Sequence, residues 1–560
     1  MRKASYAVVA LAVLYSLSVP AAQTPGWIYA TSIVSFSPGP NTTGEYANPA
    51  NALGAPDYKV GGAPEYVSLG NGGTLILKLA EPGIAASGEA FPDIRVVEIG
   101  EQGEPVDVYI SQNGADWILV GSTISANSLD IDQPTNANTE TYYKYVKLID
   151  LPPVQSGAPY AGADIDAVVA IPRTGMEQKG PPSNSCSTPG QLEPESYAGN
   201  PVNFSIGNKS QREVDYTFPH GSLQFARTYN SLDGLWRHNH STYLSFSQND
   251  VRLTMADGRE LFFSVSGSIV TSASKDLGVL TKSGTGWEFL STSNERFTFN
   301  STGQLTKWST PQGAIQQLAY SGTKVTVTDN LGNTLSFTED AAHQPLTLTA
   351  SGVTFTYTYD SEKRLLSVTR SASGKSSQRI YHYEYTNNNA LLSGVTDERG
   401  VRFSTWGYDD QGRPTSSEHT NGADRVTIKY DNDGSVAVTN EFGRVTKYSF
   451  QTIRGVRLIS SIDGEPTPNC PNSNSTFTYD ARGLLKTRTD AKGNLTTYDY
   501  NDRGLETSRT EASGTPQART VTTEWHPTLF LKTKVTEPDR ITTYQYDAQG
   551  RQTGQIVTPR

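Results

Sequence analysis

The second part of the chain carries a regular pattern of aromatic positions. Most of these positions are 20 to 23 residues apart, with one shorter step of 17 and longer steps of 25, 26 and 29. Twelve marks near one spacing indicate a repeat array. The marks are Phe299, Tyr320, Phe337, Tyr359, Tyr385, Tyr408, Tyr430, Phe450, Tyr479, Tyr500, Trp525 and Tyr546.

Another apolar or aromatic residue stands two positions before most marks, as Phe477 precedes Tyr479 and Tyr498 precedes Tyr500. Alternation with a period of two predicts a strand with one buried face. Because this pairing recurs along the array, we interpret the rings as lining a shared interior rather than as a platform for sugars.

A turn follows each such strand. An Asp or Asn after the mark leads to Gly within four residues, as in Asp480 to Gly483 and Asn501 to Gly504. Glycine adopts the positive φ of a tight turn, and Asp or Asn hydrogen-bonds its own backbone there. Each repeat is therefore predicted to be a hairpin that pairs with the next one in a continuous sheet.

Residues 27–172 have a different texture of strands and loops. The segment PVDVYISQNGADWILV (105–120) predicts a hairpin with an Asn-Gly turn, closed by Trp117, for which we expect a buried ring. The Pro-, Gly- and Ser-rich stretch 173–195 is predicted to be a linker.

The first residues have the order of a secretory signal peptide: a charged start, an apolar run at 6–19, then Ala21 and Ala22. We expect cleavage of residues 1–22 and export. The run is too short for a membrane-spanning helix, which needs about 20 residues, and no later stretch predicts a span.

Composition narrows the function. A formal net charge of −10 with a pI near 5.4 argues against nucleic acid as a partner. The chain has no phosphate-binding glycine-rich loop, no Gly-x-Ser-x-Gly and no His-Glu-x-x-His. We therefore expect a protein that is not an enzyme.

The segment YDARGLLKTRTDAKGNLTTYDY (479–500) resembles the YD repeat of the Rhs family, and YDAQGR (546–551) repeats its opening. Upstream, NPVNFSIGNKSQREVDY (200–216) and LTMADGRELFF (253–263) resemble the domain that usually precedes Rhs repeats. Motifs such as NPANALGAPD (48–57) and GADIDAVVAI (162–171) resemble a discoidin-like, galactose-binding-type jelly roll.

These resemblances imply an all-β chain. The expected order is the signal peptide (1–22), a jelly-roll domain (27–172), the linker (173–195), a β-rich pre-repeat domain (196–290) and a spiral sheet of Rhs/YD hairpins (291–560).

In the Rhs family the repeats form a hollow shell around a toxin, which implies a scaffold for toxin delivery or competition between cells. The chain stops partway through a repeat and carries no toxin region, so we expect either a truncated array or a second chain that completes the sheet. The alternative is a surface adhesin whose jelly roll binds a glycan or a matrix partner. Both alternatives place the protein outside the cell or at its surface.

Acidic residues of the first domain suggest a structural calcium site, because calcium takes oxygen ligands from separate loops. Asp57, Asp93, Glu98, Asp164 and Asp166 are the candidates, and the resemblance to calcium-carrying jelly rolls favours Asp164, Asp166 and Asp57. The competing interpretation is that these carboxylates are solvated ends of turns and strands. No other cofactor is predicted.

The two cysteines, Cys186 and Cys470, allow either a disulfide, which export would permit, or two separate thiols. His238 and His240, with His220 nearby, alternate on a predicted strand as a metal pair would. No carboxylate stands at a matching short spacing, so a structural role is favoured.

Overall fold

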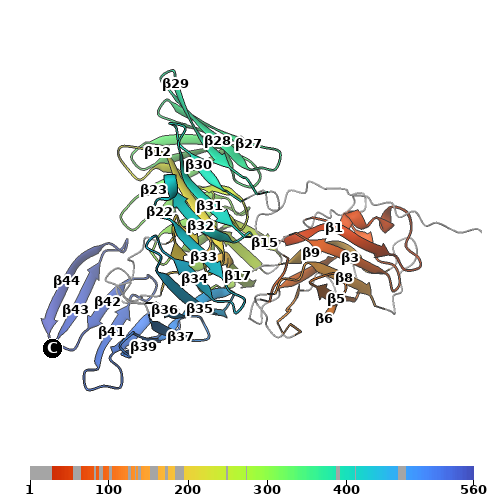
Figure 1. The fold of residues 1–560 in the computed structure, drawn as a ribbon. Coiled ribbons are helices and arrows are strands. Elements are labelled where there is room, and N and C mark those ends of the chain that lie inside the picture. The colour runs from red at the N-terminus through yellow and green to blue at the C-terminus, as the bar shows by residue number, and fades with distance from the viewer. Residues whose placement is uncertain are drawn as a thin grey trace, which may run out of the picture. The chain divides into compact units, whose positions relative to one another are not determined.

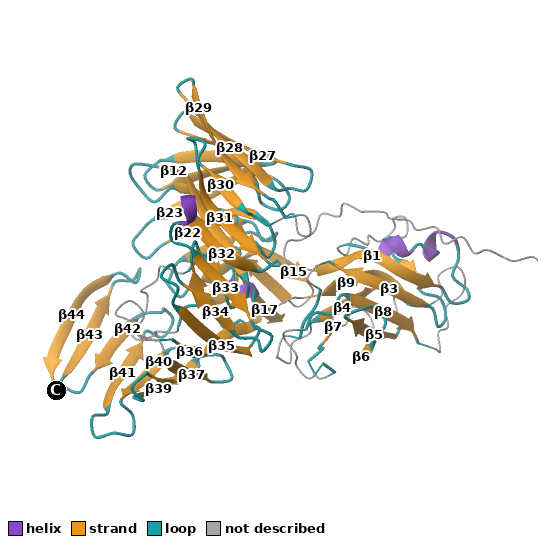
Figure 2. Ribbon diagram, in the orientation of Figure 1, coloured by secondary structure: helices purple, strands orange, loops and turns teal. Residues whose placement is uncertain are grey.

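The computed structural model describes residues 28–54, 65–80, 83–86, 93–99, 104–123, 128–132, 134–135, 141–151, 162–170, 175–182, 194–247, 250–272, 274–385, 391–409, 412–464 and 474–560. The chain forms two compact units, residues 1–172 and 173–560. Figure 2 shows that both are built of strands, which confirms the all-β prediction. The described helices are short 3-10 turns: η1 (Gly44–Ala47), η2 (Pro49–Ala52), η3 (Met176–Gln178) and η4 (Thr420–Gly422).

The first unit is a β-sandwich. Its antiparallel strands follow the order β6-β5-β8-β3-β1-β9-β4-β7, with β2 beside β9. The start of β1 pairs with β9 and the rest pairs with β3, so β1 joins the two layers. Side chains from both layers, such as Leu77 and Val168, form one core. The strands are β1 (Ile28–Ser37), β2 (Val67–Ser68), β3 (Thr74–Leu79), β4 (Ile94–Glu98), β5 (Val106–Ser111), β6 (Ile118–Thr123), β7 (Ser128–Leu129), β8 (Tyr145–Asp150) and β9 (Asp164–Ala170).

The predicted Asn-Gly hairpin lies between β5 and β6, and Asn113 accepts hydrogen bonds from the backbone N–H groups of Ala115 and Asp116. The expectation of a buried Trp117 was wrong. Its ring is half-buried and lies outside the core, because the residue shares the outward face of the sheet with Leu119. The alternation around the turn predicted the hairpin correctly but not which face is covered.

The second unit begins with two small antiparallel sheets in which each strand pairs with the next in sequence. One consists of β10 (Tyr197–Ala198), β11 (Val202–Asn203), β12 (Asn208–Thr217), β13 (Gln224–Asn230) and β14 (Trp236–His238). The other consists of β15 (Tyr243–Ser247), β16 (Asp250–Thr254), β17 (Glu260–Ser266) and β18 (Ile269–Ser272).

A single antiparallel sheet of 26 strands follows, and along it the strands keep the order of the sequence from β19 to β44. Figure 1 shows the colours passing in order along this sheet, and the continuous hairpin array is confirmed. The sheet begins at Val279, earlier than residue 291. Its strands are β19 (Val279–Ser283), β20 (Gly286–Leu290), β21 (Arg296–Phe299), β22 (Leu305–Ser309), β23 (Ile315–Ser321), β24 (Lys324–Asp329), β25 (Thr334–Glu339), β26 (Pro345–Ala350), β27 (Val353–Tyr359), β28 (Leu365–Ala372), β29 (Lys375–His382), β30 (Gly394–Thr396), β31 (Arg402–Tyr408), β32 (Pro414–His419), β33 (Val426–Tyr430), β34 (Val436–Thr439), β35 (Val445–Ile453), β36 (Val456–Asp463), β37 (Ser475–Tyr479), β38 (Leu485–Thr489), β39 (Leu495–Tyr500), β40 (Glu506–Glu511), β41 (Arg519–Trp525), β42 (Lys532–Thr536), β43 (Arg540–Tyr546) and β44 (Gln552–Pro559).

The inner face of the early repeats packs on the small sheets. Phe225 and Trp236 from the small sheets share one core with Phe337, Tyr357 and Trp406 from the repeats. The aromatic pattern of the early repeats therefore builds a core, as the period-two alternation indicates.

Candidate functional site

The tyrosines that mark the repeats form hydrogen bonds to the neighbouring strand, beyond the point where the backbone pairing of the two strands ends. The Tyr500 hydroxyl donates a hydrogen bond to the Leu485 carbonyl at 2.7 Å, where the preceding strand begins. The same bond recurs along the array from Tyr320, Tyr359, Tyr408, Tyr430, Tyr479 and Tyr546. The ring thus contributes apolar contact while its hydroxyl satisfies a backbone carbonyl.

The acidic residue after the tyrosine closes the turn. One carboxylate oxygen of Asp480 accepts the backbone N–H groups of Arg482 and Leu484, and Gly483 adopts a φ of 78°. Asp360 and Asp547 make the equivalent pairs of bonds after their tyrosines, and Asp397 and Asp490 make them in turns that follow a threonine. The predicted turn chemistry of Asp and Gly is confirmed.

An ion pair is buried between the small sheets and the repeats. Arg227, 1% exposed, binds Asp215 through two nitrogens, at 2.6 and 2.9 Å. The Tyr357 hydroxyl donates to the same carboxylate at 2.7 Å, and Arg227 donates to the Tyr381 hydroxyl at 3.0 Å. The buried pair, with its two tyrosine hydroxyls, thus links the small sheets to β27 and β29 of the repeats.

The two histidines on β14 and just after it have partners in the sheet. His238 bonds Glu339 at 2.8 Å, and His240 bonds the side-chain oxygen of Gln316 at 3.1 Å. Both rings also stack on Phe225. Burial lowers the pKa of His238, and it lowers the pKa of His240 to about 3. These contacts give both rings partners within the protein, and His220 accepts a hydrogen bond from Asn333 at its backbone carbonyl.

Residues 175–182, within the predicted linker, are packed into the second unit where they are described. The Lys179 ammonium, 2% exposed, binds Glu260 at 2.6 Å and Asp233 at 3.2 Å. The Gln178 side chain donates to the Arg457 carbonyl at 2.9 Å. Residues 175–182 therefore contact both the small sheets and β36, and they do not form a solvated linker.

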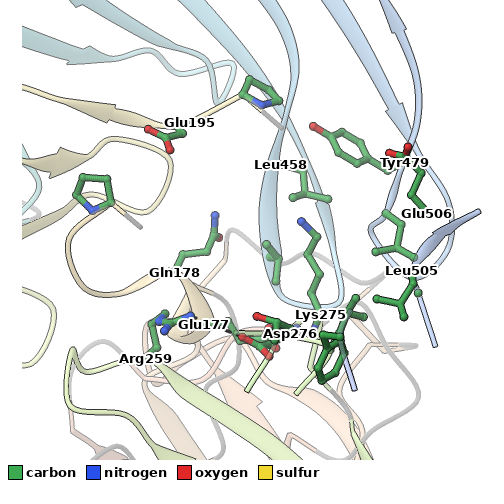
Figure 3. Close-up of a pocket in the computed structure, with 18 of the residues that line it drawn as sticks. Glu177, Gln178, Glu195, Arg259, Lys275, Asp276, Leu458, Tyr479, Leu505 and Glu506 are labelled. Atoms are coloured by element: carbon green, nitrogen blue, oxygen red, sulfur yellow. Dashed lines mark hydrogen bonds and ion pairs between the residues drawn. The ribbon is translucent and has the colours of Figure 1, made fainter. Parts of the chain in front are cut away.

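A cavity of about 1080 Å³ opens between this packed segment and the inner face of the late repeats. Figure 3 shows Glu177, Lys275 and Asp276 on one side of it and Tyr479 and Glu506 on the repeat strands opposite. Burial, together with the charge of Asp276, raises the pKa of Glu177 to about 8, although two backbone N–H groups bond its carboxylate. Burial also raises the pKa of Glu506.

A clasp, formed by Asn294 and the 526–531 loop, joins the late repeats to the early ones. Asn294, in the turn after β20, accepts the Phe530 N–H at 2.8 Å and donates to the Phe530 carbonyl at 3.3 Å. Arg503 donates to four carbonyls of the same loop, from His526 to Leu529. The sheet therefore curls far enough for β41 and β42 to reach the strands near its beginning, and the cavity lies inside this curl.

Four of the candidate calcium ligands, Asp93, Glu98, Asp164 and Asp166, lie within the described residues. Asp164 accepts a hydrogen bond from the Ser68 hydroxyl at 2.5 Å, and burial raises its pKa to about 7. Asp166 is 2% exposed on the same strand, and Glu98 is 5% exposed. Asp57, Cys186, Cys470 and the signal peptide lie outside the described residues.

Asp93 instead meets two residues that the sequence patterns did not single out. One carboxylate oxygen from each of Asp93, Asp130 and Asp132 lies within 4.8 Å of the others, the one such group among the described residues. Asp93 also accepts the Ile131 N–H at 3.1 Å. Three carboxylates on neighbouring loops are hard oxygen ligands of the type that calcium takes. The calcium site expected at Asp164, Asp166 and Asp57 stays a prediction.

No described helix is long and apolar enough to cross a bilayer.

No curated protein matches the sequence. Among solved structures, the TcdB2-TccC3 crystal structure shares 11% identity at a TM-score of 0.27, over 62% of this chain and 20% of that one. The TcdB2-TccC3-Cdc42 structure shares 13% identity at a TM-score of 0.26, over 63% of this chain and 19% of that one. The Photorhabdus luminescens Tc holotoxin pore shares 13% identity at a TM-score of 0.24, over 64% of this chain and 21% of that one. The chain thus spans about a fifth of the length of these structures.

Two sequence families match the second unit. Residues 199–263 match a domain of unknown function, DUF6531, and residues 479–516 match the RHS repeat. The first match falls on the small sheets and the second on β38–β40, where the tyrosine and aspartate bonds repeat. The chain is therefore an Rhs/YD-repeat protein, with its pre-repeat domain in front of the array.

Proposed function

We propose that the chain is a non-enzymatic scaffold, the N-terminal part of a toxin-associated Rhs shell that is exported for delivery or competition between cells. The observation that carries the proposal is the single curled sheet, whose early part is packed on the pre-repeat domain and whose late part faces an open cavity. The RHS repeat match is the reason for proposing a toxin as the cargo, because in that family the repeats enclose one.

Crosslinking tests this function. A permanently unfolded polypeptide is fused after Arg560, and a photoreactive residue replaces either Tyr544, which lines the cavity, or Gln545, its exposed neighbour on β43. The shell function predicts crosslinks to the fused polypeptide from position 544 well above those from position 545. Equal yields from the two positions would contradict it.

A partner that completes the sheet is part of the same proposal. In the described residues β44 pairs only with β43, and Ile556 and Val557 are 52% and 54% exposed. An open edge is a template for another strand, which can come from further repeats or from a second chain. Amide hydrogen exchange in β44 is expected to be slower in a complex with that partner than in the isolated chain. Unchanged exchange would contradict the proposal.

A second role, attachment to a glycan or a matrix partner, is proposed for the first unit. The observation that favours it is the half-buried Trp117, which lies with Tyr109 and Tyr145 on an outward sheet face. A glycan array probed with the full chain is the test, and no binding to any sugar would remove this role.

A further inference from the structure

The outward face formed by β6, β5, β8 and β3 in the first unit is aromatic where a sandwich usually shows polar residues. In β3 and β8 buried residues alternate strictly with half-buried ones. The outward series contains Tyr109, Trp117 and Tyr145, none of which belongs to the core. A face of this kind on an antiparallel sheet marks a contact surface.

A lysine lies between two of these rings. Lys147 is directly opposite Tyr109 across β8 and β5, and its Nζ is 4.3 Å from the Tyr109 ring centroid and 4.6 Å from that of Trp117. Leu119, 48% exposed, is opposite Tyr109 on the other side. The two rings hold the ammonium in place by cation–π attraction, so it is positioned before any ligand arrives. We call Tyr109, Trp117, Leu119 and Lys147 the aromatic-lysine face.

The charge of the unit makes this position unusual. Residues 28–172 contain 17 Asp and Glu but only 5 Lys and Arg. Of the basic residues, Arg95 is 6% exposed, whereas Lys147 and Lys78 point outward from neighbouring strands. An acidic unit thus presents positive charge on the same face as its half-buried rings. This local charge complements an anionic group that lies against the rings.

We propose that the aromatic-lysine face binds an acidic saccharide, a glycan that contains uronic acid units. The pyranose ring of a uronate offers a flat face of C–H groups for Tyr109 or Trp117, and its carboxylate takes a charge-assisted hydrogen bond from Lys147. Both features lie on one sugar unit, which matches the short distances between the two rings and the ammonium. The inference rests on the proposed attachment role of the first unit and is independent of the shell.

Calorimetry with the full chain and an oligogalacturonate tests the proposal. A chelator is present so that calcium does not contribute, and a neutral galactan and a polyglutamate peptide serve as comparisons. The wild-type chain is expected to bind the oligogalacturonate at least about tenfold more tightly than either comparison, a difference of ~1.4 kcal/mol.

Two variants and a charge-matched control locate the site. Lys147→Gln is expected to weaken oligogalacturonate binding about tenfold and to leave the weaker galactan binding unchanged. Trp117→Ala is expected to weaken the binding of both oligogalacturonate and galactan. Lys144→Gln removes the same charge from a residue just before β8, outside the aromatic-lysine face, and is expected to change binding less than twofold. Thermal melting of each variant checks that the first unit remains folded.

Polyglutamate binding as tight as that of oligogalacturonate would overturn the proposal in favour of an acidic protein partner. Equal losses in Lys147→Gln and Lys144→Gln would overturn it in favour of diffuse charge. Binding of other sugars on the array without oligogalacturonate binding would overturn the proposal alone, whereas no sugar binding would remove the attachment role as well.

Discussion

The early and late parts of the repeat sheet share one motif but differ in what covers their inner face. In the early part Phe337, Tyr357 and Trp406 are 2%, 4% and 1% exposed, because the pre-repeat domain packs on them. At the position that corresponds to Tyr357 and Trp406 in the last repeat, two residues before Tyr546, Tyr544 is only half-buried and lines the cavity. The tyrosine bond to the preceding strand is present in both parts. Local hydrogen bonds therefore define the hairpin, and the pre-repeat domain determines where it is buried.

The largest difference between the two parts is expected from removal of an indole. Trp406, in the early part, is 1% exposed and its Nε1 donates to the Asn200 carbonyl at 3.1 Å. Trp406→Ala should therefore lower the free energy of unfolding by ~3–5 kcal/mol. Trp525→Ala, in the late part, should cost less than about 2 kcal/mol because the ring is already partly solvated. Urea unfolding measures both, and equal costs would break the comparison.

Acid should loosen the early part first. A histidine whose pKa falls on folding contributes its full stability above its unfolded pKa of 6.5, and this contribution is lost as the pH falls toward the folded value, about 3 for His240. Lowering the pH to about 5 should therefore raise amide exchange, corrected for intrinsic rates, in β14 and β25 before β41 and β43. His240→Gln should flatten this response. Uniform loss of protection along the sheet would contradict the prediction.

Loss of the clasp should act on the late part alone. Asn294 has a φ of 61°, so Asn294→Gly keeps the backbone conformation while it removes both bonds to Phe530. The free energy of unfolding is expected to fall by ~1–2 kcal/mol, and proteolysis at the 526–531 loop should become faster. Asn421→Gly, at an exposed residue with a φ of 62°, is the matched control and should leave that loop unchanged.

The smallest effects are expected from the tyrosine hydroxyls. Tyr408→Phe leaves the Leu392 carbonyl without its buried donor and should cost ~1 kcal/mol. In Tyr546→Phe water can replace the lost donor at the Lys532 carbonyl, so the cost should be below about 0.5 kcal/mol. Chemical denaturation of the two variants compares them directly, and a larger cost for Tyr546→Phe would reverse the expected order.

The repeat fold was predictable because its interactions are local. Tyr, Asp and Gly act within one hairpin, so a single sequence shows their spacing and their roles. The clasp was not predictable, since Asn294 and Phe530 are 236 residues apart and neither belongs to a motif. The covered face around Trp117 was misjudged for a related reason: alternation separates the two faces of a strand but does not say which one meets the core.

The carboxylate cluster at Asp93 and the buried ion pair of Lys179 could not be predicted from the sequence for the same reason. Asp130 and Asp132 become candidates only where the fold brings them to Asp93. Lys179 lies in a Pro- and Gly-rich stretch that reads as a linker, and only Glu260, 81 residues later, explains its burial. The candidate sites thus depend on long-range packing that a periodic pattern does not encode.

The sequence order of the 26 strands has a consequence for how the protein is made. Each new strand pairs with the hairpin just completed, so loop-closure entropy stays small at every step. The sheet can therefore grow from β19 while later residues are still emerging from the ribosome. The pre-repeat domain precedes the sheet and supplies the first apolar surface. Vectorial growth on this template lets a long β-sheet form without waiting for distant strands.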